Sequence, residues 1–377
     1  MTFRLLVVLF FVQFKILAQS LSVSNLPILV INTKGATIVD EPKIPAKFTL
    51  YDRGKGQLNQ MTDKPAFSFW AGIEYRGSTS QGDWYFLPGL VKKPYGFEIW
   101  TDSVAMKSMK LPIVQMPTES DWVLNASYND RTFLRDVVAQ QMAGQLGLQH
   151  SNTRYVEVVL NDAYQGIYIL MEKIKQGGAR LDIADLKSID NAGDDVTGGY
   201  LVKIDKTSGA TARSWNSSYV SGKGTFKSYF QIEYPKAENI TTQQFTYIKN
   251  HVNTFEKSLQ EENPLKALST YRSMMDMPSF VNYFLLNELS RNVDGYRLST
   301  YFYKDKDSKG GKLTMGPAWD YNLAFGNADY YDGYLPQGWV YNKLELSEQG
   351  IADGFQTPFW WGKLMRDSVF VNSVKRR

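Results

Sequence analysis

The hydrophobic pattern of this sequence changes near Thr241, and that change limits the possible folds more than any other feature. Upstream of it, short runs that alternate apolar and polar residues predict strands. Downstream, apolar residues at helical spacing predict helices over 241–259 and 276–290. Strands followed by helices indicate an α+β protein. The predicted strands span residues 28–31, 47–52, 67–76, 91–100, 154–160, 167–174 and 199–205.

One predicted helix lies among the strands, and one predicted hairpin lies among the helices. The helix begins at Asn129 or Asp130, which are favourable N-cap residues, and ends at Gly147. The hairpin pairs 300–303 with 312–315 and turns at Gly310-Gly311. The helix is expected to bury one apolar stripe, made of Phe133, Leu134, Val137, Val138, Met142 and Leu146.

This order of elements predicts two lobes with a cleft between them. The N-terminal lobe, about 21–206, is expected to be β-rich, and the C-terminal lobe, about 207–377, to be α-rich. At the end of the chain, residues 374–377 fall inside a helix predicted to begin near Pro358. We therefore expect the sequence to be truncated at its C-terminus.

Residues 1–20 have the features of a secretory signal peptide. Arg4 supplies the positive start, residues 5–12 form an apolar run, and Ala18-Gln19-Ser20 is a cleavage site with small residues at both ends. The apolar run is too short to span a bilayer, and no later stretch is long enough. We expect a secreted or extracytoplasmic protein without a transmembrane segment.

The composition excludes several kinds of site. The chain has no Cys, which excludes a disulfide framework, a thiolate metal site and a Cys nucleophile. Only two histidines are present, His150 and His251, so a multi-histidine metal centre and a Ser-His-Asp triad are disfavoured. The net charge of +4 is spread along the chain and gives no concentrated basic face, so no nucleic-acid partner is expected.

Two aspartates flank the predicted C-terminal hairpin. Asp294 follows the helix 276–290, and Asp320 follows the second hairpin strand. The hairpin brings both carboxylates to the same end, where one can deprotonate an acceptor hydroxyl and the other can hold magnesium on nucleotide phosphates. Mg²⁺ suits such a site, because it binds through one or two carboxylates together with phosphate and water.

The N-terminal half contains residues suited to phosphate. Arg76 opens a loop of small residues, in which Ser78 and Ser80 let backbone N–H groups approach a phosphate. Lys93 shares a strand face with Tyr95 and Phe97 under strict alternation, so we favour it over Lys92 as the phosphate-binding lysine.

Five segments, in this order, resemble the CotH (spore coat protein H) kinase family over about residues 25–330. They are Arg-Gly-Ser-x-Ser (76–80), Lys-Lys-x-Tyr-Gly-Phe-Glu (92–98), Glu-Ser-Asp-Trp-Val-Leu (119–124), Tyr-x-Gly-Ile-Tyr-x-Leu-x-Glu-Lys-Ile (164–174) and Gly-Pro-x-Trp-Asp-Tyr-Asn (316–322).

The resemblance implies an atypical, two-lobed protein kinase-like fold that transfers phosphate from ATP to Ser or Thr of proteins outside the cytoplasm. It implies Asp294 as the catalytic aspartate, Asp320 as the magnesium ligand and Lys93 as the nucleotide lysine. It also implies that Glu172 lies at the hinge, near the adenine.

The sequence departs from ordinary kinases at several positions. Ser299 stands five residues after Asp294, where kinases carry a magnesium-binding Asn; Asn322 is a candidate to compensate. The helix 130–146 has no Glu to pair with Lys93; its only acids are Asp130 and Asp136. A catalytically weak or inactive scaffold of the cell surface or coat therefore stays open as an alternative. The export signal and the high aromatic content, 23 Tyr, 21 Phe and 9 Trp, leave a second alternative open, a secreted carbohydrate-active enzyme with paired carboxylates.

Overall fold

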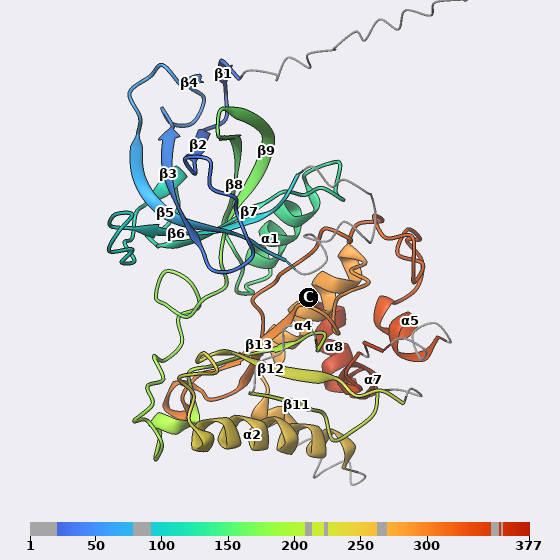
Figure 1. Ribbon diagram of the computed structural model, residues 1–377. Coiled ribbons are helices and arrows are strands. Elements are labelled where there is room, and N and C mark those ends of the chain that lie inside the picture. The colour runs from blue at the N-terminus through green and yellow to red at the C-terminus, as the bar shows by residue number, and fades with distance from the viewer. Residues whose placement is uncertain are drawn as a thin grey trace, which may run out of the picture.

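The computed structural model describes residues 21–77, 92–207, 213–221, 225–261, 270–347, 354–355 and 357–377 (Figure 1). The predicted signal peptide, Ser78 and Ser80 lie outside these residues. Within them, no helix is both long enough and apolar enough to cross a membrane.

Seven strands close into a barrel in the order β2-β3-β5-β6-β7-β9-β8. Neighbouring strands are antiparallel except β2 and β8, whose parallel pairing closes the barrel. Buried aromatic side chains fill the interior, among them Phe48, Phe97, Trp122 and Tyr168. The strands are β2 (Ile28–Asn32), β3 (Ile44–Tyr51), β5 (Phe67–Tyr75), β6 (Tyr95–Trp100), β7 (Asp121–Asn125), β8 (Thr153–Leu160) and β9 (Ala163–Glu172), and β1 (Val23–Ser24) pairs with β4 (Asn59–Gln60) beside them.

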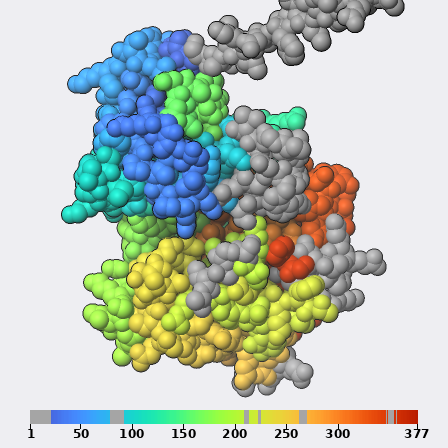
Figure 2. Space-filling model, in the orientation of Figure 1, coloured from blue at the N-terminus to red at the C-terminus, as the bar shows by residue number. Residues whose placement is uncertain are grey.

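A second antiparallel sheet has the order β11-β12-β10-β13-β14. Its strands are β10 (Tyr200–Ile204), β11 (Ser214–Asn216), β12 (Tyr229–Tyr234), β13 (Thr300–Lys304) and β14 (Leu313–Met315). Figure 1 shows this sheet and its helices below the barrel, and Figure 2 shows their surface in yellow to red under the blue and green barrel surface. The helices are α1 (Arg135–Gln145), α2 (Thr242–Gln260), α4 (Met277–Ser290), α5 (Val340–Leu346), α7 (Trp360–Leu364) and α8 (Ser368–Arg376), with 3₁₀ turns at Ile113–Gln115, Asp195–Thr197 and Asp307–Lys309.

The helices of this second part begin where their capping residues predict. Thr241 forms a reciprocal capping box with Gln244 at the start of α2. Asp276 accepts a hydrogen bond from the Ser279 N–H at 2.9 Å at the start of α4. Both helices contribute to a large core in which Trp360 packs edge-on against Phe255, with ring centroids 5.1 Å apart.

The predicted fold class, a two-lobed protein kinase-like fold with an α-rich C-terminal lobe, is wrong. The protein is a β-rich α+β structure with a closed seven-stranded barrel and few helices. The upstream strands form a barrel because β2 pairs with β8, an association between segments more than a hundred residues apart. The downstream half is built on a sheet because β10 pairs with β12 on one side and with the later hairpin strand β13 on the other.

The predicted buried stripe of the first helix is confirmed only in part: Val137, Met142 and Leu146 pack against buried clusters, but two members of the stripe do not. Leu134 and Val138 are exposed, at 53% and 37% of their surface. The buried face of α1 instead carries Asp136, Ala139, Gln140 and Ala143. The helix presents this polar face to the segment that contains Asp320, as described below.

Candidate active site

The structure brings Asp294 and Asp320 into one neighbourhood at the end of the β13–β14 hairpin. Asp294 lies in the loop that follows α4, which ends at Arg291 in the left-handed conformation, with φ of 54°. Its carboxylate oxygen Oδ1 accepts hydrogen bonds from Tyr330 Oη at 3.1 Å and Arg297 Nη2 at 3.3 Å. These two contacts, together with a half-buried setting, orient the Asp294 carboxylate.

Asp320 adopts a left-handed backbone conformation, with φ of 66°. Such a conformation is unfavourable for a residue with a Cβ and is found preferentially at functional sites. Ser299 Oγ donates a hydrogen bond to Asp320 Oδ2 at 3.3 Å. Asp320 keeps a solvent-exposed surface, so the surrounding protein does not seal it off.

The electrostatic surroundings of Asp320 are strongly acidic. The protein packed around the carboxylate raises the pKa of Asp320 to about 7, and the negative charges of Asp136, Asp294 and Asp205 contribute to the rise. The hydrogen bond from Ser299 opposes it. A carboxylate with this pKa changes its charge near neutral pH, which is typical of groups at functional sites.

Two neighbours of Asp320 were not predicted as site residues. Ser299 was predicted only as a weak substitute for Asn, yet its hydroxyl is bonded to Asp320. Asp205 follows β10, where Ile204 pairs with Thr300 of β13, so the next position of the same register places Asp205 opposite Ser299. The sequence contained a signal for Asp205, because this acid is the last residue of a predicted strand. Once that strand pairs with the hairpin, Asp205 lies at the edge of the sheet next to Ser299.

Asn322 and Glu172 are bonded to other side chains. Asn322 Nδ2 donates to Asn129 Oδ1 at 3.0 Å, which ties this segment to the loop before α1. The Glu172 carboxylate is buried, pairs with Arg180 and accepts two hydrogen bonds from Asn152. Its role near an adenine stays a prediction, but the next residue, Lys173, lines the pocket described below.

Lys92 and Lys93, which precede β6, lie elsewhere on the barrel. The Lys92 ammonium donates to the Ile167 carbonyl and lies over the Tyr168 ring, 4.4 Å from its centroid. Burial lowers the pKa of Lys92 to about 8, partly offset by Glu157. Lys93 is half-buried, and its carbonyl accepts a hydrogen bond from Tyr168 Oη at 3.0 Å. Neither lysine lines the pocket beside Arg76.

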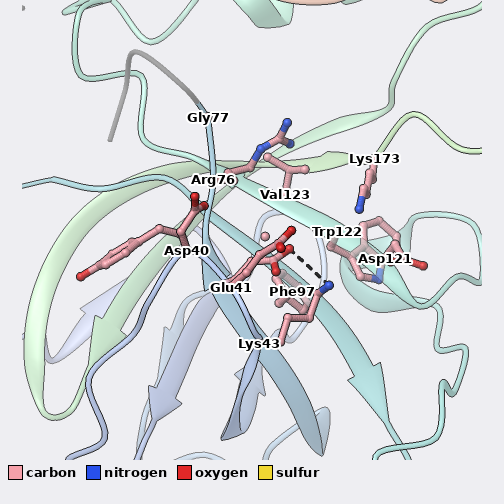
Figure 3. A pocket seen from close by; sticks show the side chains of 13 residues that line it. Asp40, Glu41, Lys43, Arg76, Gly77, Phe97, Asp121, Trp122, Val123 and Lys173 are labelled. Carbon is pink, nitrogen blue, oxygen red and sulfur yellow. Dashed lines mark ion pairs between the residues drawn. The ribbon is translucent and has the colours of Figure 1, made fainter. Parts of the chain in front are cut away.

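A pocket of about 510 Å³ opens beside Arg76 (Figure 3). Its apolar wall contains Phe97, Trp122 and Val123. Figure 3 shows three cationic side chains around it, those of Lys43, Arg76 and Lys173. The pocket also contains acids, Asp40, Glu41, Glu74 and Asp121.

The acids and bases of this pocket are partly paired. Lys43 pairs with Glu74 at 3.2 Å, and Asp121 pairs with Lys175, outside the pocket lining, at 2.7 Å. Lys173 makes no hydrogen bond or ion pair with any of the described residues. Burial lowers the pKa of Lys173; the neighbouring cations add to this effect, and Asp121 opposes it. Lys173 is thus a cation that an anionic ligand in the pocket would stabilise.

Arg76 connects the pocket with the aspartates. Its guanidinium lies over the Trp319 ring, 5.3 Å from the ring centroid, and Trp319 directly precedes Asp320. Burial lowers the pKa of Arg76, while the negative charges of groups that include Asp320 and Glu74 raise it. A ligand that fills the pocket and extends past Arg76 would therefore reach Asp320.

The donor atoms near Asp320 suit a hard cation. They are carboxylate and hydroxyl oxygens, the ligand type that Mg²⁺ prefers. Among the residues that the structure describes, no three His, Cys, Asp or Glu side chains are grouped closely enough to hold a metal ion. The oxygens of Asp320 and Ser299 would suit Mg²⁺ if phosphate and water supplied its remaining ligands.

The fold and the site together define an α+β protein in which an acidic centre adjoins a pocket of mixed charge at the edge of a barrel. Residues 73–377 match the family model described as "CotH kinase protein", and the chain therefore belongs to the CotH family. No curated protein matches the sequence.

Proposed function

We propose that this protein is an ATP-dependent protein kinase that phosphorylates Ser or Thr of proteins outside the cytoplasm. The observation that carries the proposal is the proximity of Asp294 to Asp320, beside a pocket that contains cations. Membership of a family described as a kinase supports the same reaction class. The signal peptide predicted over residues 1–20 supports the location of the acceptor.

The two aspartates have different roles in this proposal. Asp294, oriented by Arg297 and Tyr330, accepts the proton of the acceptor hydroxyl. The hydroxyl oxygen then forms a bond to the γ-phosphorus, the bond from that phosphorus to the β–γ bridging oxygen breaks, and ADP leaves. Asp320, with Ser299 bonded to it, is the residue that would hold Mg²⁺. The metal would neutralise charge on the phosphates.

The nucleotide is assigned to the pocket of about 510 Å³, a size within the usual range for small-molecule sites. The apolar wall of Phe97, Trp122 and Val123 suits a base. Lys173 and Arg76 suit phosphates, since both are cationic side chains on the pocket wall.

Transfer of the labelled γ-phosphate of ATP to a generic protein acceptor tests the proposal. The proteins compared are the wild type, Asp320→Ala and Asp294→Asn, with Glu238→Ala as an exposed-acid control. We expect the control to match the wild type and Asp320→Ala to be inactive. Asp294→Asn should lose ~10²–10⁴-fold in rate, the usual worth of a general base. If the wild type transfers label no faster than Asp320→Ala, the kinase assignment is wrong.

A thermal-shift measurement separates the kinase from the alternatives. ATP at about 100 times its Kd, with Mg²⁺, should stabilise the protein by about 2.7 kcal/mol. Stabilisation without phosphate transfer would favour the scaffold. Hydrolysis of a polysaccharide without any nucleotide would favour the carbohydrate-active enzyme.

A further inference from the structure

The buried face of α1 is polar where it meets the segment that contains Asp320. Three α1 side chains bind the backbone of this segment: Gln140 Nε2 donates to the Ala318 carbonyl at 3.0 Å, Asp136 Oδ1 accepts from the Tyr321 N–H at 2.7 Å, and Arg135 Nε donates to the Ala324 carbonyl at 3.0 Å. A helix that served only for packing would bury apolar side chains here, because burying a carboxylate is costly.

Asp136 connects this segment to the barrel. Its second carboxylate oxygen, Oδ2, accepts a hydrogen bond from Asn125 Nδ2 at 2.9 Å. Asn125 is the last residue of β7, and the same strand lines the pocket through Asp121, Trp122 and Val123. One buried carboxylate thus links the strand that lines the pocket to the peptide that follows Asp320.

Asp320 depends on these contacts for its conformation. Its left-handed backbone is unfavourable and persists only where the flanking structure fixes it. The hydrogen bonds of Gln140 and Asp136 fix the peptides on either side of Asp320. Without the Asp136 contact, the Tyr321 N–H would lose a charge-assisted partner and the Asp320 carboxylate would be free to move.

We propose that Asp136 is a positioning residue that sets the place of the Asp320 carboxylate relative to a ligand held by the barrel strands. This inference rests on the proposed function, because the ligand concerned is the nucleotide. It predicts that loss of Asp136 affects the use of a bound nucleotide more than its binding, since Asp136 does not line the pocket.

The variants are Asp136→Ala, Asp136→Asn and Asn125→Ala. Asp136→Asn retains an oxygen that can accept from the Tyr321 N–H but turns an NH₂ donor toward Asn125 Nδ2. Asn125→Ala removes the same barrel end of the link, so both variants keep the Tyr321 contact and keep the test open if Asp136→Ala folds poorly. Glu256→Ala is the control, because Glu256 is a buried acid of α2 that is bonded to Ser217 and Trp360.

For Asp136→Ala we expect kcat to fall about 100-fold, the usual effect of a displacement of about 1 Å, with KM for ATP changed less than about threefold. Asp136→Asn and Asn125→Ala should both have a kcat between those of Asp136→Ala and the wild type, because each keeps the contact with Tyr321 and loses the contact with the barrel. The Glu256→Ala control should lose stability but keep both constants per folded molecule.

A binding measurement gives a second readout. ATP affinity is measured with EDTA and again with Mg²⁺; Asp136→Ala should keep the affinity in EDTA and lose most of the gain from Mg²⁺. An unchanged kcat and Mg²⁺ gain in Asp136→Ala, or equal impairment in Asp136→Asn, would overturn the positioning role alone. A wild type that neither binds ATP nor transfers phosphate would instead overturn the proposed function, and this inference with it.

Discussion

Glu256 should make the stability of the protein depend on pH. This α2 residue is fully buried. Ser217 Oγ donates to both of its carboxylate oxygens at 2.9 Å, and Trp360 Nε1 donates to one of them at 3.0 Å. Burial raises the pKa of Glu256 from 4.5 to about 7, against the opposing effect of these hydrogen bonds.

The size of the effect follows from the two pKa values. Because the pKa is higher in the folded state, folding favours the protonated form, and the wild type loses stability as pH rises from 4.5 to about 7. At about 1.4 kcal/mol per pH unit, the loss between pH 5 and pH 8 is roughly 2–3 kcal/mol. Glu256→Gln cannot ionise, and its amide can still bond to Ser217 and Trp360. The stability of the variant relative to the wild type should therefore increase by roughly 2–3 kcal/mol between pH 5 and pH 8.

Urea unfolding of both proteins at pH 5 and pH 8, followed by tryptophan fluorescence, measures this difference. Glu119→Gln is a matched control, because the pKa of Glu119 is shifted in the opposite direction, below its ordinary value. Burial alone would raise the pKa of Glu119, but hydrogen bonds from Ser120 and the charge of Lys175 lower it, so this variant should lose stability at neutral pH. If the unfolding free energies of wild type and Glu256→Gln differ by the same amount at pH 5 and pH 8, the pKa of Glu256 is not raised by folding.

Three further outcomes concern the site. Lys173→Met should raise KM for ATP about tenfold in steady-state kinetics, because a charge-assisted hydrogen bond contributes roughly 1.5–3 kcal/mol; an unchanged KM would remove Lys173 from the nucleotide site. Ser299→Ala should raise the pKa of Asp320 above about 7, since the lost hydrogen bond favours the ionised form, and the acid limb of the pH–rate profile should move upward. Asp294→Asn should lower the same pKa by removing a negative charge; carboxyl-¹³C NMR titration measures it, and a shift in the other direction would contradict the proximity of the two aspartates.

The hairpin and its two aspartates could be predicted from the sequence because every signal for them is local. β13 begins at Thr300 and β14 ends at Met315, as predicted, and Gly310 and Gly311 both have positive φ in the turn. Once the hairpin forms, the residues before and after it must meet at one end. The barrel has no comparable local signal, because its closure depends on the pairing of β2 with β8.

The face that α1 buries could not be predicted from the helix alone. The apolar pattern favoured Leu134 and Val138, but burial is decided by the partner, and the partner of Asp136 is Tyr321, 185 residues further along the chain. Apolar periodicity finds faces that pack against apolar surfaces. A polar face that binds backbone groups of a distant loop gives no such pattern.

The position of Asp320 is explained by its two neighbours. Trp319 packs beside Val123, Ile169 and Met171 of the barrel strands, under the Arg76 guanidinium, and it also packs against the cluster that contains Leu201 and Tyr301 of the second sheet. Tyr321 is buried in the core of the second sheet and its helices. Trp319 thus lies where the barrel meets the second sheet, Tyr321 lies inside the core of the second part, and Asp320 is the residue between them. Any shift of the barrel relative to the second sheet must therefore move the Asp320 carboxylate, which makes its position sensitive to contacts, such as those of Asp136, that hold the two parts together.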